Sequence, residues 1–522
     1  MFRPLVLLIL CFHNITALNI LVIFSLPLRS HYMSVKPFFD KLADIGHHVT
    51  VINNFPDTRL ANKIRYIDLL EGDSASSKMF PLSHYEEYDT RIMHLNNYIR
   101  HLTVSPGIIE DDCVKLFTNE NIKEHLASNT KYDLVFVEQF MSDCGLIYAA
   151  ANYDAPIIGI MSHTLLPWHY SRLGLPFDYA SDTFYFTTSG YSHPLVQKIE
   201  SLLLDKFFNT IGRWYLQRNI YNVFNKYMPE FKFDVEEIAK DRIRMMFSYQ
   251  NFALTGGRVL APQLLEIGGL HIGTTKALPQ DIKDFITNSK DGVIYFSLGS
   301  NLRASTMTDK KLSIFLKSFE KIPQNILWKW ENDTYTFNSN RILSKSWFSQ
   351  LDVLCHPNVI GFISHGGMLS TSEAAYCGVP MIAMPFFGDQ FSNAMSISNS
   401  GLGRVLQFPD INESNLIEAL KEVTSDKMQK KAKEISTHCK DRPMSVMDSA
   451  IYWTEHVARH QHSPPPLAAK YTTWFETLLL DGVVAMLLFS FVFIVYLILK
   501  VIKRLLLMIS AIALCKNKYK VE

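Results

Sequence analysis

An excess of charge of either sign is missing from this chain. Its 51 lysines and arginines balance 50 aspartates and glutamates, which leaves a formal net charge of +1 at pH 7. A protein that binds nucleic acid through phosphates needs a basic surface. The composition therefore provides no electrostatic case for nucleic acid as a partner, and the 48% of apolar residues instead supports extensive buried cores.

The first predicted strand and helix lack the glycines of a dinucleotide-binding turn. An apolar run at 19–24 is followed by a helical pattern at 34–45, which Gly46 closes, and by a second apolar run at 48–52. This order predicts a βαβ unit, yet no G-x-G-x-x-G lies between its first two elements. A nicotinamide-dependent oxidoreductase is therefore disfavoured.

Cysteine is sparse, with seven in 522 residues. Cys11 lies in the amino-terminal apolar stretch and Cys515 near the carboxyl terminus, which leaves five in the main body. Because five is an odd number, at least one of them is unpaired. The sequence therefore implies no disulfide framework and does not identify which cysteines pair.

The two ends of the chain predict its compartment. Residues 1–17 combine one early cation, Arg3, with an apolar core and the small residue Ala17, as a cleaved signal peptide does. Residues 482–499 form a run of 18 without a charge, which is long enough to cross a bilayer as a helix. Three cations follow within 500–504 and assign that side to the cytosol. We therefore expect a single-pass type I membrane protein with a lumenal body.

The last residues agree with this placement. Lys518 and Lys520 stand at the fifth and third positions from the end and resemble a dilysine retrieval signal of the endoplasmic reticulum membrane. A solvated basic tail is the alternative, and the predicted topology favours the signal. The apolar stretch 505–515 is too short for a second span, so it extends the first or lies in the interface.

Between the ends, strand and helix patterns alternate in two halves. Apolar runs at 134–138 and 156–160 continue the first half, the aromatic-rich stretch 164–228 is typical of helices and loops, and a run at 292–296 opens the second half. This pattern predicts an α/β fold with more than one domain. The predicted boundaries are a signal peptide at 1–17, an amino-terminal domain at 18–280, a carboxyl-terminal domain at 281–460, a linker at 461–481, a transmembrane helix at 482–499 and a cytosolic tail at 500–522.

Residues 362–393, FISHGGMLSTSEAAYCGVPMIAMPFFGDQFSN, carry the strongest functional signal. The predicted elements around them are a strand at 359–364, a glycine turn at 365–367, a helix that opens at Ser370 and Thr371 and ends at Cys377, and a strand at 379–384. Such a turn directs backbone N–H groups and the positive end of a helix dipole at a diphosphate. Gly366 and Gly367 allow the backbone to come close to the ligand.

Polar side chains near this turn suit the sugars of a nucleotide-sugar. Glu373 lies one helical turn further on and suits the vicinal hydroxyls of a ribose, while Asp389 and Gln390 suit a second sugar. Taken locally, Asp389 and Gln390 fit an ordinary turn after Gly388 equally well, and Glu373 fits a solvated helix position.

These motifs resemble the UDP-glycosyltransferases, specifically the membrane-anchored animal branch and its arthropod members. Upstream, Trp347-Phe348-Ser349-Gln350 and His356-Pro357-Asn358 resemble the W-x-P-Q and HPN elements of that family. Ser349 replaces the usual proline, and Leu369 stands where many members carry asparagine. The resemblance covers nearly the whole chain and implies the GT-B fold, in which two Rossmann-like doubly wound domains face a cleft.

The resemblance also implies roles for individual residues. It assigns uracil stacking to Trp347, a uridine contact to Gln350, the diphosphate to His365, Ser370 and Thr371, the ribose to Glu373, and the donor sugar to Asp389 and Gln390. We add Ser300, in the loop after the strand at 292–296, and Gly367 to this UDP-sugar site. Composition alone would instead place Trp347 in a core.

Transfer to a hydroxyl requires a base, because a neutral hydroxyl is a poor nucleophile. His31 follows the first strand in Ser30-His31-Tyr32-Met33, which resembles the element that carries the catalytic histidine of the family. A carboxylate is needed to orient its ring and to stabilise the imidazolium. Glu138, at the end of the strand at 134–138, is our candidate, and Asp143 is the alternative.

The predicted activity is inverting transfer of a hexose from a UDP-sugar to a hydroxyl of a small lipophilic acceptor. UDP-glucose is the favoured donor, and the alternatives are glucuronosyl transfer or a non-catalytic UDP-sugar-binding protein of the same fold. No cofactor or metal is expected, since no two aspartates in the chain form the D-x-D metal motif of the other main glycosyltransferase fold. The chain is a possible homo-oligomer, and glycosylation patterns begin at Asn332 and Asn412.

Overall fold

The computed structural model describes residues 17–57, 59, 62–70, 80–90, 93–175, 177, 194–257, 260–462 and 480–518. The chain forms two units, residues 1–466 and residues 467–522. The predicted signal peptide, apart from Ala17, lies outside the described residues, and so does Lys520 of the predicted retrieval signal.

The first half of the larger unit is built on a seven-stranded parallel sheet with the order β3-β2-β1-β5-β6-β7-β8. The central strands are buried along nearly their whole length, which explains their continuous apolar sequences. The strand order reverses between β1 and β5, so a crevice is expected beyond their carboxyl ends. The strands are β1 (Asn19–Phe24), β2 (His48–Asn53), β3 (Ile64–Asp68), β5 (Leu134–Glu138), β6 (Ile157–Met161), β7 (Ile243–Ser248) and β8 (Leu264–Glu266).

The second half repeats this design with a six-stranded parallel sheet in the order β12-β11-β9-β13-β14-β15. Here the strand order reverses between β9 and β13. The strands are β9 (Val293–Ser297), β11 (Asn325–Lys329), β12 (Ile342–Lys345), β13 (Val359–Ser364), β14 (Met381–Ala383) and β15 (Gly403–Val405). The predicted fold class, two doubly wound parallel sheets, is confirmed.

Helices follow most strands and cover the sheets. In the first half they are α1 (Arg29–Asp44), α2 (Met93–Thr118), α3 (Glu120–Ala127), α4 (Cys144–Asn152), α5 (Pro167–Leu173), α6 (Pro194–Phe208), α7 (Ile211–Tyr227), α8 (Val235–Arg242) and α9 (Phe252–Thr255). In the second half they are α10 (Gln280–Thr287), α11 (Asp309–Glu320), α12 (Gln350–Leu354), α13 (Met368–Cys377), α14 (Gln390–Ser400), α15 (Glu413–Val423), α16 (Asp426–Lys440) and α17 (Val446–Arg459).

Two helices that bear site residues begin earlier than predicted. The helix expected at 34–45 is α1, which begins at Arg29, so His31 lies in its first turn. The helix expected to open at Ser370 is α13, which begins at Met368, because Gly366 takes a left-handed φ of 77° and Gly367 already serves as the N-cap. The first shift places His31 at the positive end of α1, and the second keeps Ser370 and Thr371 within the first turn of α13.

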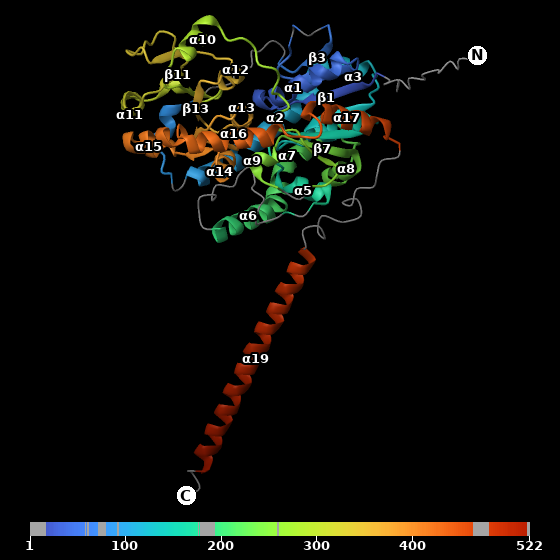
Figure 1. The fold of residues 1–522 in the computed structure, drawn as a ribbon. Helices are drawn as coiled ribbons and strands as arrows, with labels where there is room; N and C mark the ends of the chain where they lie inside the picture. Colours follow the sequence, from blue (N-terminus) through green and yellow to red (C-terminus); the bar gives the residue numbers. More distant parts are fainter. Residues whose placement is uncertain are drawn as a thin grey trace, which may run out of the picture. The chain divides into compact units, whose positions relative to one another are not determined.

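The two halves exchange elements. Helix α17 follows the second sheet in sequence but packs on α1 and β7, where Ala450 and Val457 join the core of the first sheet (Figure 1). In the other direction, the two-residue strand β4 (Phe80–Pro81) pairs with β10 (Leu302–Arg303) of the second half. These crossings tie the halves into one compact unit.

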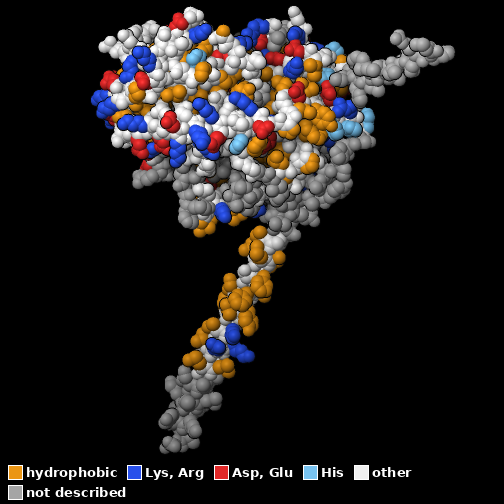
Figure 2. Space-filling model, in the orientation of Figure 1, with side chains coloured by type: hydrophobic (Ala, Val, Ile, Leu, Met, Phe, Trp, Pro, Cys, Tyr) orange, Lys and Arg blue, Asp and Glu red, His pale blue; other side chains and the backbone are white. Residues whose placement is uncertain are grey.

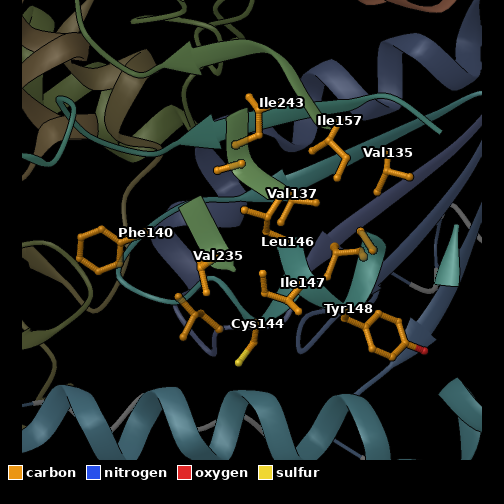
Figure 3. Close-up of a cluster of buried hydrophobic side chains, with 14 of the residues drawn as sticks. Val135, Val137, Phe140, Cys144, Leu146, Ile147, Tyr148, Ile157, Val235 and Ile243 are labelled. Atoms are coloured by element: carbon orange, nitrogen blue, oxygen red, sulfur yellow. The ribbon is translucent and has the colours of Figure 1, made fainter. Parts of the chain in front are cut away.

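Helix α4 packs its apolar side against β5 (Figure 3). Leu146 and Ile147 of α4 are fully buried beside Val135 and Val137 of β5. Cys144 opens the helix and forms a disulfide with Cys113 of α2. The core under β5 therefore rests on apolar packing and on one covalent link.

The cysteine prediction needs a correction. The structure holds a second disulfide, between Cys355 and Cys377, which joins the ends of α12 and α13, and Cys439 is free. The parity argument thus holds, because four of the five cysteines pair, but a disulfide framework exists. The partners are 31 and 22 residues apart, and only the tertiary fold brings them together.

A buried network of charges joins four helices of the first half. Asp143, which precedes α4, accepts hydrogen bonds from Arg172 of α5 at 2.9 Å and from Arg213 of α7. Glu236 of α8 accepts from the same two arginines. The two guanidinium groups hold the pKa of Asp143 well below its ordinary value. Asp143 is therefore a structural carboxylate.

The smaller unit contains one long helix, α19 (Leu480–Lys518). Residues 482–508 are apolar enough and long enough to cross a membrane, and their side chains are not buried against the rest of the protein. Figure 2 shows the apolar surface of this helix, interrupted by cationic side chains toward its carboxyl-terminal part. The predicted span at 482–499 thus lies within a longer apolar helix, and the stretch from 505 continues it.

Candidate active site

One cavity of about 570 Å³ is lined by most of the predicted site residues of both halves, but Glu138 and Thr371 are not on its wall. Its volume is in the range of small-molecule sites. The first half contributes residues that follow β1, β5 and β6, and the second half contributes residues that follow β9 and β13. The predicted residues on its wall are His31, Ser300, Trp347, Gln350, His365, Gly367, Ser370, Glu373, Asp389 and Gln390.

The predicted base and its predicted partner are in contact. His31 Nδ1 lies 2.5 Å from Glu138 Oε1, and both side chains are buried. His31 stands in the first turn of α1 after β1, and Glu138 is the last residue of β5. The strand reversal between β1 and β5 therefore brings the two groups together. Asp143, the alternative partner, is held by Arg172 and Arg213 instead.

Burial decides the protonation of this pair. It raises the pKa of Glu138 to about 8 and lowers the pKa of His31 well below its ordinary value, and the neighbouring His163 lowers the pKa of His31 further. Both shifts disfavour charge, so burial by itself favours the neutral pair, in which Glu138 Oε1 holds the proton that it shares with Nδ1. With that proton on Nδ1, the Nε2 lone pair of His31 can accept one from a substrate.

The turn before α13 presents the ring of His365. A Cβ atom at Gly299 would lie 2.5 Å from this ring, and one at Gly367 would lie 2.4 Å from it, so both glycines make room for the imidazole. Burial lowers the pKa of His365 to about 4, which keeps the ring neutral near pH 7. A neutral imidazole beside a helix amino terminus can donate one hydrogen bond to a diphosphate.

The residues expected to bind uridine and ribose are joined to one another. Gln350 Nε2 donates to Glu373 Oε2 at 2.6 Å and to Ser370 Oγ at 2.9 Å. Trp347 lines the cavity with 70% of its surface exposed, which rejects the core alternative. The carboxylate of Glu373 is thus held in place, while the indole offers an open face for stacking.

The remaining residues predicted to bind the donor differ in their hydrogen bonds and in whether they line the cavity. Asp389 Oδ2 accepts from Asn393 Nδ2 at 2.7 Å, and Gln390 Oε1 accepts from the backbone N–H of Phe386 at 2.8 Å. Thr371 does not line the main cavity, because its hydroxyl donates to the Gly367 carbonyl at 3.0 Å and its side chain is buried on another side of α13. Its predicted diphosphate contact has no support in the geometry.

Two histidines of the first half belong to the site and were not predicted. His271 Nε2 lies 3.3 Å from Glu373 Oε1, and its Nδ1 shares a hydrogen bond of 2.5 Å with Tyr249. His163 Nε2 lies 2.9 Å from His31 Nε2. His163 follows β6, so the rule that ligands bind beyond strand ends could have identified it. No sequence pattern marks His271.

Comparison with known proteins places the chain in a family. The family model described as "UDP-glucoronosyl and UDP-glucosyl transferase" matches residues 20–515. The chain belongs to this family. A relative named "UDP-glycosyltransferase UGT5", from Dactylopius coccus, is 33% identical over 509 residues, covering 92% of this chain and 90% of that protein. "UDP-glucuronosyltransferase 2B19" of Macaca fascicularis is 27% identical, with 87% of each chain covered.

Solved structures support the GT-B fold of this glycosyltransferase. The glycosyltransferase VinC, in complex with DTDP, has a TM-score of 0.56 at 15% identity, covering 85% of this chain and 100% of that chain. The calicheamicin glycosyltransferase CalG4 has a TM-score of 0.53 at 14% identity, covering 86% and 100%. At these identities the likeness concerns the fold alone.

The described part of the glycosyltransferase contains no group of three or more His, Cys, Asp or Glu side chains arranged to hold a metal ion. Independence from metals remains a prediction.

Trp347→Ala should weaken UDP binding by about 1–3 kcal/mol, because base–aromatic stacking elsewhere contributes that much. Isothermal titration with UDP measures the change. Since Trp347 is 70% exposed, the melting temperature should stay unchanged.

Trp214→Ala is the matched control, because Trp214 is 65% exposed and does not line the cavity. An unchanged affinity in Trp347→Ala would remove Trp347 from the donor site.

Proposed function

We propose that the enzyme transfers a hexose from a UDP-sugar, with inversion, to a hydroxyl of a small lipophilic acceptor, with His31 as the base. The observation that supports this most is the contact of 2.5 Å between Glu138 and His31, since His31 lines the cavity that also holds the uridine-site residues. Base and donor site thus share one space, as direct transfer requires.

The proposed reaction is a single displacement. His31 Nε2 takes the proton of the acceptor hydroxyl while its oxygen attacks the anomeric carbon from the face opposite UDP. The bond between that carbon and the diphosphate oxygen breaks, and UDP leaves with the electron pair. His365 and the backbone N–H groups at the start of α13 stabilise the charge on the diphosphate. Glu138 stabilises the imidazolium of His31.

The charges on the cavity wall favour an uncharged donor sugar. Among the described residues that line the cavity, Lys329 is the single lysine or arginine. Its ammonium group already donates to Glu331 Oε1 at 2.8 Å, and both side chains are largely buried. A glucuronate carboxylate would need a free cation in this space. UDP-glucose therefore remains the favoured donor, with glucuronosyl transfer as the alternative.

The acceptor side of the cavity is apolar. Around His31 the wall is formed by aliphatic, aromatic and thioether side chains that follow β1 and β5 or belong to α2. They are Leu26, Leu28, Ile108, Ile109, Phe140 and Met141. Such a surface suits a lipophilic alcohol or phenol, which would gain free energy from burial.

We also propose a lumenal body anchored in the membrane of the endoplasmic reticulum. Two disulfides in the body favour an oxidising compartment. The apolar helix at 482–508 favours a membrane anchor. Both predicted glycosylation acceptors, Asn332 and Asn412, are exposed.

His31→Ala should lower kcat by about 10²–10⁴ and leave UDP binding nearly intact, because the base belongs to the other half of the cavity. Glu138→Gln should lower kcat by a similar factor, and the double variant should be hardly worse than His31→Ala, since the two residues act as one unit. His48→Ala is the matched control, because His48 is exposed on β2.

The variant Asp143→Asn tests which of the two carboxylates, Glu138 or Asp143, assists His31. It should leave kcat within about threefold and lower the melting temperature, because breaking a buried ion pair costs about 3–5 kcal/mol. A fully active His31→Ala variant would contradict the proposed mechanism.

Membranes that contain the enzyme should transfer sugar from UDP-glucose faster than from UDP-glucuronate across a panel of phenols. The physical reason is the pairing of Lys329 with Glu331. Preference for UDP-glucuronate would overturn the choice of donor, and UDP-sugar binding without transfer to any acceptor would favour the non-catalytic alternative.

Glycans should be present at Asn332 and Asn412 and should remain sensitive to endoglycosidase H. Asn412 caps α15 by accepting from the backbone N–H of Asn415 at 3.1 Å, so its own substitution would destabilise that helix. Ser414→Ala and Thr334→Ala remove the acceptor patterns while keeping both asparagines. Replacing Lys518 and Lys520 by serine should give resistant glycans, and unglycosylated protein would contradict the lumenal placement.

A further inference from the structure

His163 stands between the two halves of the cavity. It follows β6 in the first half, and it is 8% exposed. Its Nε2 lies 2.9 Å from His31 Nε2, and its Nδ1 lies 3.4 Å from Asp389 Oδ2 of the second half. The rings of His31 and His163 meet edge to face, with centroids 4.6 Å apart. One imidazole therefore touches both the proposed base and the carboxylate expected at the donor sugar.

The four groups form a continuous chain from Glu138 through His31 and His163 to Asp389. A hydrogen bond at each of its three contacts would use three protons. Two neutral imidazoles supply two of them, and the third would sit on Glu138, His31, His163 or Asp389. The charge of His163 lowers the pKa of Asp389, which disfavours a proton on that carboxylate.

The location of the third proton decides whether His31 can act as a base. With the proton on Glu138 or on His31, Nε2 of His31 carries hydrogen and cannot accept another. With the proton on His163, this ring becomes an imidazolium that donates from Nε2 to His31 and from Nδ1 to Asp389. His31 then keeps its Nε2 lone pair, and Asp389 balances the charge of His163.

We propose that His163 is a positioning residue for the transfer reaction: it holds the third proton next to Asp389, keeps Nε2 of His31 unprotonated, and yields its place on that nitrogen to the acceptor hydroxyl. The inference rests on the proposed function, because it assigns His31 as the base. It adds a link between the donor half and the protonation of the base.

The electrostatic surroundings of His31 support this arrangement. The titratable groups that face it are Glu138 from β5, His163 after β6 and Asp389 before α14. Burial raises the pKa of Glu138, and the charge of His163 opposes this by lowering it. After burial, the charge of His163 is the main influence that lowers the pKa of His31, while Asp389 raises it. Removing the charge of His163 therefore raises the pKa of His31.

The test is the pH profile of kcat/KM for two variants. His163→Gln keeps an N–H donor for His31 but loses the charge, and His163→Leu loses both. Each should move the acidic limb to higher pH by about one unit, so that activity near pH 6.5 falls about tenfold. On the alkaline plateau, His163→Gln should stay within about threefold of the parent, and His163→Leu should fall further because the ring of His31 loses its partner.

His125→Leu is the matched control. His125 is buried in the same half but bonds to Tyr132 at 2.9 Å, away from His31. A melting curve of each variant confirms that it is folded. The control should keep the acidic limb of the parent protein.

A second measurement does not need turnover. Diethyl pyrocarbonate modifies unprotonated imidazoles, and peptide mass spectrometry follows the modification of His31 as a function of pH. The midpoint for His31 should rise by about one unit in His163→Gln. An unmoved midpoint in folded variants overturns the role of His163. A shifted midpoint together with full activity of His31→Ala would instead overturn the proposed base.

Discussion

The parallel pairing of β1 with β5 is the constraint on which the site depends. Ile23 lies beside Val137, so both strands end at the same edge of the sheet, and the chain order reverses between them. His31 and Glu138 therefore meet although 107 residues separate them. The second sheet repeats the device, because β9 and β13 end side by side at Ser297 and Ser364. One cavity lies beyond the carboxyl ends of these four strands. The first half contributes His31 to its wall, and the second half contributes the residues of the proposed donor site.

Burial has opposite effects on two carboxylates of the first half. Glu138 has an imidazole as its hydrogen-bond partner, so desolvation dominates and raises its pKa to about 8. Asp143 is just as buried, but two guanidinium groups overcome the desolvation and lower its pKa. Only the first situation leaves a proton that can move near pH 7. The neighbouring charge, and not burial by itself, thus separates a carboxylate suited to proton transfer from one that serves the fold.

The donor wall is held together by contacts that cross elements. The disulfide between Cys355 and Cys377 joins α12 to α13, and Gln350 of α12 bonds to Glu373 of α13. His271 of the first half lies against the same carboxylate. A UDP-sugar bound at Glu373 would therefore contact residues of both halves. Membership of the family is consistent with this arrangement.

The sequence by itself determined the elements and the type of site. Apolar runs predicted the strands because parallel strands are buried on both faces, and the glycine turn at 365–367 predicted a phosphate-binding helix start because it needs special backbone geometry. Tertiary structure alone placed Glu138 against His31 and Asp143 against Arg172. It also paired the cysteines, turned Thr371 away from the cavity and brought His163 and His271 into it. These outcomes depend on contacts between residues far apart in the chain. A local sequence pattern cannot predict such contacts, because they form only when the sheets and helices pack together.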